Sequence, residues 1–207
     1  MKKIYEYTNY EELLRDLKEK YGIPQYPYFK NDINYSMETR IKRGKEGLFL
    51  HHDREDTVIQ LSVVDYNIMY DYPFEYHMPE NLTYANYIEH LMLHVLISCS
   101  NNINDELSQE TGIGGIINYF CPQINTYLSK AYQYKPEWLL TSLKIFDTED
   151  GFDAYVKCLR YLLDNYNRLN KTPRDKLLEK LCRFDLRVAY NYELADIFKD
   201  KLKKLLL

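Results

Sequence analysis

The sequence predicts an α+β fold, in which a small strand-containing unit lies within a mostly helical chain. Two short extended stretches, residues 47–50 and 81–85, precede several segments in which apolar residues recur every three or four positions. That spacing is typical of the buried face of a helix. We therefore divide the 207 residues into an N-terminal helix with a basic lead-in (1–46), the strand-containing unit (47–100) and a helical region packed on it (101–207).

The N-terminal helix is predicted to begin at the capping sequence Thr8-Asn9-Tyr10-Glu11 and to end at Gly22. Four apolar residues fall on one stripe of this helix: Leu13, Leu14, Leu17 and Tyr21.

A basic segment lies directly before the first strand. It contains four cations within six residues: Arg40, Lys42, Arg43 and Lys45. These side chains are either contacts to nucleic-acid phosphates or the solvated face of a turn, which short runs of charge usually are. Their position beside the histidines described next slightly favours phosphate contact.

All five histidines of the chain lie between residues 51 and 94. The first pair, His51-His52, ends the apolar strand at 47–50. A long loop follows from Asp53 to Glu80, in which residues 57–62 alternate enough to predict a short strand. The aromatic remainder is expected to be an ordered surface loop, and its His77 is not expected to be a ligand.

Three carboxylates, Asp53, Glu55 and Asp56, come directly after the first histidine pair. Beside a metal site they can be ligands or can tune the pKa of His52. More often, such residues are solvated parts of a turn.

The second histidine pair is predicted to lie on a helix. Asn86 and Glu89 form a capping box that begins it, and His90 and His94 follow four residues apart. Residues at this spacing project from one face, so both imidazoles can reach the same metal ion.

In order, these features are a strand, His-His, a loop, a short strand with Asn81, and a helix with His-x3-His. This pattern resembles the HNH, or ββα-metal, nucleases, most closely their colicin-type DNase version. In that family, as here, nine residues separate the Asn from the first helix histidine and four separate the two helix histidines. The resemblance covers roughly residues 40–100. It extends to about residue 130 through a Gly-Gly-Ile-x-Asn-Tyr sequence at 114–119, which is similar to one in HNH-like proteins of phages and mobile elements. The 29 residues from His52 to Asn81 are a longer separation than in the family.

The resemblance implies a small ββα-metal motif and a role for each matched residue. His51, His90 and His94 correspond to metal ligands, and His52 to the general base that activates water. Asn81 corresponds to the residue that fixes the loop and orients this base. Arg40, Lys42, Arg43 and Lys45 would hold the DNA backbone.

The implied cofactor is one divalent metal ion. Three imidazoles suit Zn²⁺ or another transition ion such as Mn²⁺ or Ni²⁺ and leave a coordination position open. Mg²⁺ fits less well because it prefers oxygen ligands.

Composition and charge constrain the function less than the histidine pattern does. The net charge of −4 and the pI of about 5.8 count mildly against nucleic-acid binding. The cysteines are widely spaced and predict reduced, mostly buried thiols, and the chain shows neither a signal peptide nor a membrane-spanning apolar run. We expect a cytoplasmic protein without membrane contact.

The helical region is predicted to begin with a helix-breaking turn at residues 111–116. Two helices are predicted at 123–133 and 136–145. Three more are predicted to begin after a cap at Thr148, after Thr172-Pro173 and after Asn191.

Three functions remain open from the sequence. The first is metal-dependent hydrolysis of DNA phosphodiester bonds by a single-metal, His-base mechanism. The second is a catalytically weak or inactive HNH-like protein, for example a phage-type inhibitor or regulator, that binds a protein partner through its helical C-terminal region. The third, a helical interaction protein without metal, requires the histidine spacing to be accidental. Target sequence, RNA or DNA, strandedness and oligomeric state are not determined.

Overall fold

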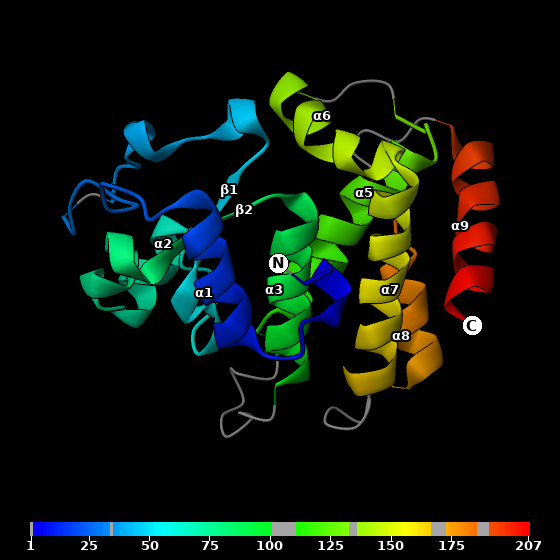
Figure 1. Ribbon diagram of the computed structural model, residues 1–207, viewed down its shortest axis with the longest axis horizontal. Coiled ribbons are helices and arrows are strands. Elements are labelled where there is room, and N and C mark those ends of the chain that lie inside the picture. Colours follow the sequence, from blue (N-terminus) through cyan, green and yellow to red (C-terminus); the bar gives the residue numbers. More distant parts are fainter. Residues whose placement is uncertain (1, 34, 101–110, 133–135, 167–172, 186–190) are drawn as a thin grey trace.

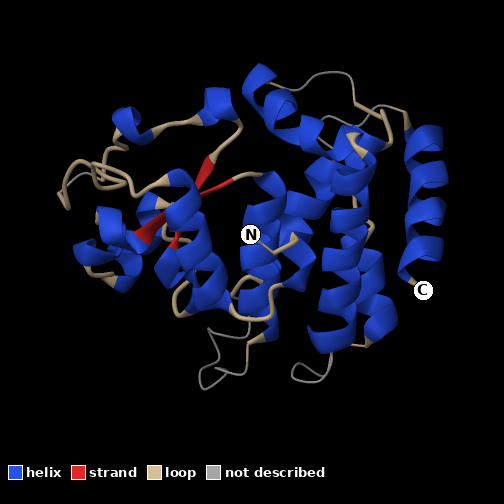
Figure 2. Ribbon diagram, in the orientation of Figure 1, coloured by secondary structure: helices blue, strands red, loops and turns tan. Residues whose placement is uncertain are grey.

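The protein is described by a computed structural model in which residues 2–33, 35–100, 111–132, 136–166, 173–185 and 191–207 are placed. Most of these residues are helical, and the strands form one two-stranded antiparallel sheet (Figures 1 and 2). This agrees with the predicted α+β class.

The sheet pairs β1 (Phe49–His52) with β2 (Leu82–Ala85). Phe49 lies opposite Ala85 and His52 lies opposite Leu82. The first strand begins two residues later than predicted and includes both histidines. Because side chains alternate along a strand, His51 and His52 face opposite sides of the sheet.

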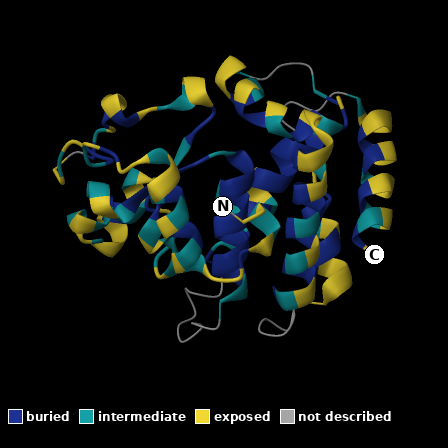
Figure 3. Ribbon diagram, in the orientation of Figure 1, coloured by how far each residue is buried: buried dark blue, intermediate teal, exposed yellow. Residues whose placement is uncertain are grey.

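Helix α3 (Tyr87–Cys99) lies at the centre of the molecule, and its residues are mostly buried (Figures 1 and 3). The predicted capping box is confirmed. The Asn86 side chain accepts from the Glu89 backbone N–H, and the Glu89 carboxylate accepts from the Asn86 N–H. Around α3 is the main hydrophobic core, to which α1 (Tyr10–Tyr21) and α7 (Glu149–Asn165) contribute.

Helix α1 ends where the sequence predicts, but its cap lies one residue later than the predicted Thr8–Glu11 box, since the Asn9 side chain accepts from the Glu12 N–H. Asn9 caps it, and Gly22 ends it with a φ of 79°, a backbone conformation that favours glycine. Near its end, Lys20 forms an ion pair with Glu89, 2.6 Å between Nζ and Oε1, which joins α1 to the start of α3.

The segment between the strands is more structured than predicted. It holds helix α2 (Val64–Tyr70) and three 3-10 turns, η4 (Asp53–Asp56), η5 (Phe74–His77) and η6 (Pro79–Asn81). The strand predicted at 57–62 is wrong, since these residues form turns. Gln60 has a φ of 59°, which breaks any extended run there.

The remaining elements are mostly in the C-terminal half. The predicted caps at Thr148 and Asn191 are confirmed. Gln133, the predicted end of the helix at 123–133, and Thr172, a predicted cap, lie outside the described residues. The bounds are η1 (Ile4–Glu6), η2 (Thr39–Ile41), η3 (Gly44–Glu46), α4 (Ile113–Gly115), a π-helical turn η8 (Ile116–Phe120), α5 (Cys121–Leu128), α6 (Glu137–Leu143), η9 (Lys144–Asp147), α8 (Arg174–Leu181) and α9 (Tyr192–Leu206).

Two expectations about the whole chain can be compared with these elements. The four cysteines are free, and all except the partly buried Cys99 are buried. Among the described residues, no helix has both the length and the apolar character of a membrane span.

Candidate metal centre

Three histidines from two elements converge beside α3. His51 comes from β1, and His90 and His94 lie one turn apart on α3. One ring nitrogen from each histidine lies within 4.8 Å of the other two, so the group could hold a metal ion. The centroids of the three rings are 5.1 to 5.4 Å apart.

The tautomer of His51 is set by Tyr10 of α1. The Tyr10 hydroxyl donates its hydrogen to the Asp53 carbonyl oxygen at 3.0 Å, and its oxygen lies 2.6 Å from His51 Nε2. The hydroxyl has only one hydrogen, so His51 Nε2–H donates to it. Nδ1 of His51 therefore keeps its lone pair, and this buried atom has no hydrogen-bond partner in the structure.

His94 is fixed in a similar way by the glycine-rich turn. Its Nδ1 lies 3.2 Å from the Gly112 carbonyl oxygen, which can only accept, so Nδ1 carries the proton and Nε2 the lone pair. Gly115 lies against the same ring, because a Cβ there would be 2.8 Å from His94 Nδ1. Outer-shell contacts of this kind orient metal-binding histidines in known sites.

The histidines of this group are neutral at physiological pH. Burial lowers the pKa of His51 to about 3, and it also lowers the pKa values of His90 and His94. Among the described residues, Nδ1 of His90 is a second buried atom without a hydrogen-bond partner. Buried polar atoms are rarely left unpaired, and neutral imidazole is the form that binds metal, so the donor set fits a transition ion.

Glu55 of η4 lies between the histidines. One carboxylate oxygen is 3.4 Å from His94 Nε2 and 3.6 Å from His51 Nδ1, and the other is 3.6 Å from His52 Nδ1. Two nitrogens bound to one tetrahedral zinc lie roughly 3.3 Å apart, given zinc–nitrogen bonds of about 2.0–2.1 Å. Glu55 is therefore close enough to two of the histidines to join them as a ligand. Asp53 is instead held by Lys18 and Thr83.

The ring of His52 lies on the other face of β1 from His51, with its Nδ1 3.6 Å from Glu55, which also contacts His51 and His94. The His52 ring packs against Tyr28, with centroids 4.4 Å apart, and its Nε2 lies 3.1 Å from Nδ1 of His77. His77 contacts Asn67 in turn. His77 is outside the metal group, as the sequence analysis expected, but it is the hydrogen-bond partner of the candidate base.

The Asn81 side chain contacts the loop before β2. Its side-chain amide donates to the Glu75 carbonyl oxygen at 2.8 Å, which ties the loop before β2. Within the described part of the chain, the hydrogen bonds of His52 and Asn81 do not join the two residues.

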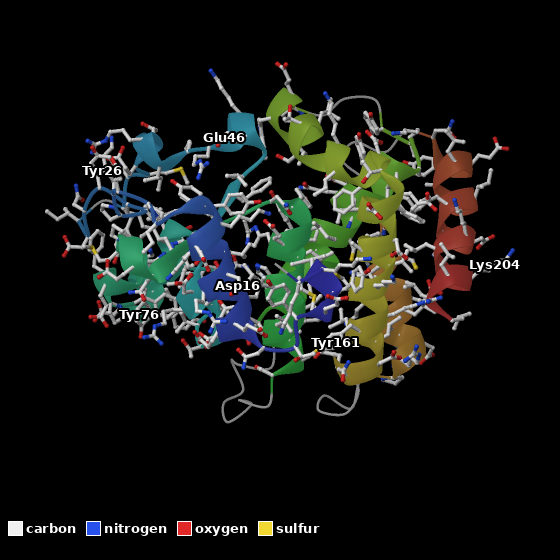
Figure 4. All side chains as sticks on the ribbon, viewed as in Figure 1. Asp16, Tyr26, Glu46, Tyr76, Tyr161 and Lys204 are labelled. Atoms are coloured by element: carbon white, nitrogen blue, oxygen red, sulfur yellow. The ribbon has the colours of Figure 1, made fainter. Side chains whose placement is uncertain are left out.

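The basic segment is partly neutralised by its own carboxylates. Arg40 pairs with Glu38 and lies 3.8 Å from the centroid of Tyr26, and Arg43 pairs with Glu46. Tyr26 and Glu46 are labelled near the outer edge of the molecule in Figure 4. Lys42 and Lys45 are exposed.

Sequence reasoning did not assign the roles of several residues around the site. Glu55 was one of three carboxylates with open roles, and His77 was set aside because it was not a ligand. Tyr10 lies 41 residues before His51, so no local pattern could connect them. The turn predicted at 111–116 is wrong from Ile113 onward, because Ile113–Gly115 is helix α4 and Ile116 begins η8; the contacts of Gly112 and Gly115 with His94 were not predicted.

Comparison of the chain with protein-family models, with curated proteins and with solved structures found no match.

Proposed function

We propose that the protein is a metal-dependent endonuclease of the HNH type that hydrolyses DNA phosphodiester bonds. The observation that carries the proposal is the convergence of His51, His90 and His94, with His52 beside them on the opposite face of the strand. The neutral state of the three ligands and the unpaired nitrogens of His51 and His90 support it.

Each residue has a role in this proposal. His51, His90 and His94 hold the ion, and Glu55 is available as a further ligand. The bound ion would act as a Lewis acid on the phosphodiester and its leaving oxygen. His52 accepts a proton from the attacking water, because an imidazole can act as a base at neutral pH.

The DNA backbone would be held by the basic segment. Lys42 and Lys45 are exposed and available for phosphates. Arg40 and Arg43 would have to exchange the carboxylates of Glu38 and Glu46 for phosphate oxygens. Such contacts fix position rather than read sequence.

The test is plasmid nicking by purified protein supplied with Zn²⁺, Mn²⁺, Ni²⁺ or Mg²⁺ in turn. Substitution His52→Ala should lower the rate by about 10²–10⁴-fold, the usual contribution of a general base, without changing the amount of bound metal. Substitution His90→Ala should lower both. Equal nicking by His52→Ala and the parent would refute the assignment of the base.

One observation favours a second candidate, in which the metal is structural. His52 has only 1% of its surface exposed, and His51 has none. A catalytic metal site must admit substrate, whereas a structural site is closed by its protein ligands. In this alternative the protein is an inactive HNH-like inhibitor or regulator that binds a protein partner through its helical C-terminal region. Tight metal binding without nicking under any of the four metals would support it.

A further inference from the structure

The segment between the two strands buries two polar residues next to His52. Asn67, on α2, and His77, at the end of η5, each have 0% of their surface exposed. Burying an amide and an imidazole is costly unless their polar atoms are hydrogen-bonded. Their hydrogen bonds form one chain that ends at His52, and its direction can be worked out from the atoms involved.

The direction is fixed at Asn67. Its side-chain nitrogen donates to two backbone carbonyl oxygens, those of Leu61 and Val63, each at 2.8 Å. Carbonyl oxygens only accept, so the amide cannot be turned around without losing both bonds. Its side-chain oxygen is therefore the atom that lies 2.8 Å from Nε2 of His77.

The remaining protons follow from that oxygen. Because it can only accept, Nε2 of His77 carries a proton, and Nδ1 of the neutral His77 ring has the lone pair. That lone pair faces His52 Nε2 at 3.1 Å. Nε2 of His52 must then be the donor, which leaves the lone pair of His52 on Nδ1. This nitrogen lies 3.6 Å from Glu55, on the side of the candidate metal centre.

We propose that Asn67 and His77 are positioning residues that hold His52 as its Nε2–H tautomer, with the lone pair on Nδ1. The inference rests on the proposed function in one respect, the role of His52 as the base. The assignment of protons does not depend on that role.

Aromatic rings pack around His52 and His77. The ring of Phe29 lies 4.8 Å from that of His77, and Tyr28 packs against both histidines at 4.4 and 6.4 Å between centroids. If the acceptor on His77 is removed, Glu55 remains an acceptor 3.6 Å from the other ring nitrogen of His52, Nδ1. Loss of His77 should therefore move the proton of His52 from Nε2 to Nδ1.

Two substitutions of His77 separate positioning from packing. Substitution His77→Leu removes the acceptor. Substitution His77→Gln retains a carbonyl oxygen for His52 and an amide N–H for Asn67. Two-bond ¹H–¹⁵N spectra of the full-length protein report which ring nitrogen of His52 carries the proton. The parent and His77→Gln should show Nε2–H, and His77→Leu should show Nδ1–H with unchanged metal content.

Asn125 provides a matched control for Asn67. It is also fully buried, and its amide donates to two backbone carbonyl oxygens, those of Leu181 and Arg183. Its oxygen accepts from Tyr155 rather than from a histidine. Substitution of either asparagine by Leu removes equivalent hydrogen bonds, but only Asn67→Leu should change the His52 tautomer.

The rate of plasmid nicking is the second measurement. It should fall about 10–100-fold in His77→Leu, as for other outer-shell partners, and recover in His77→Gln. A parent His52 that carries its proton on Nδ1 would overturn the proposal, even if His77→Leu does not fold. An unchanged His52 tautomer in folded His77→Leu would also overturn it. If the tautomer moves as expected but the parent nicks no DNA, the positioning is supported and the nuclease function is what fails.

Discussion

Gly115 lies against the ring of His94, and we predict that Gly115→Ala weakens metal binding. A Cβ at position 115 would lie 2.8 Å from His94 Nδ1 and 2.9 Å from Cε1. At Gly114, the preceding residue of α4, an added Cβ would meet nothing within 4 Å. Substitution Gly114→Ala is therefore a matched control, with the same added methyl group in the same short helix.

The size of the effect follows from how far the ring must move. It has to retreat by about 0.6 Å to restore an ordinary contact of 3.4 Å. The ring is held by the Gly112 carbonyl oxygen and by Phe120, whose centroid is 5.1 Å away. Metal–ligand distances tolerate only about 0.2 Å, so we expect a loss of about 10–100-fold in affinity. This corresponds to roughly 1.4–2.7 kcal/mol of binding free energy.

The assay is competition for Zn²⁺ with a chromophoric chelator, carried out on the parent and both glycine variants. Melting of the metal-free proteins measures the cost of overpacking separately, which is typically about 1–3 kcal/mol. An affinity of Gly115→Ala within twofold of that of Gly114→Ala would refute the reasoning, since His94 could then move without leaving the site.

Three further predictions concern the hydroxyl beside His51, the metal and the acid stability. Substitution Tyr10→Phe leaves His51 Nε2–H without its acceptor, so we expect the free energy of unfolding to fall by about 1–3 kcal/mol and metal binding to weaken. Denaturation and chelator competition measure the two effects. An unchanged metal affinity would contradict this prediction. Chelation of metal present at 1,000 times its dissociation constant removes about 4.1 kcal/mol, so the melting temperature should fall by roughly 8–16 °C, whereas a protein without a metal site would show no change. The hydrogen bonds from Arg40 lower the pKa of Glu38 to about 2, so Glu38 contributes stability above its unfolded pKa of about 4.5 and loses it as the pH falls towards 2. The stability difference between the parent and Glu38→Gln should therefore disappear over that pH range, and a constant difference down to pH 2 would contradict it.

The features that the sequence predicted well are those set by neighbours in the chain. The capping box of α3 and the buried stripes are patterns of residues close in the chain, so Asn86 and Glu89 could be assigned without knowing the fold, whereas the box predicted at Thr8–Glu11 is not formed. The common face of His90 and His94 follows from the same period. That His51 would join them required the resemblance, because no local rule brings a strand end to a helix 39 residues later.

The failures have a physical origin in the segment between the strands. The apolar residues at 57–62 alternate as in a strand, but β1 and β2 pair only with each other, and Gln60 turns the chain with a left-handed φ. Helix α2 was missed because it has only seven residues, its N-cap Val63 makes no side-chain cap, and Ile68 and Met69 are exposed on it. Its Asn67 side chain instead hydrogen-bonds the carbonyl oxygens of Leu61 and Val63 and the ring of His77, and no helix or capping pattern predicts these bonds.

The register of the strands determines which histidine can have which role. His51 and His52 are adjacent in the chain but face opposite sides of β1, opposite Thr83 and Leu82. One is therefore held by Tyr10 and faces the helix histidines, and the other is held by His77. If β1 slipped by one residue against β2, His51 and His52 would exchange faces of the sheet. His51 would then lose Tyr10 as its hydrogen-bond partner and would no longer face the histidines of α3. The two adjacent histidines therefore reach different partners because they lie on a four-residue strand, and in the proposed function this register decides which of them is the ligand and which the base.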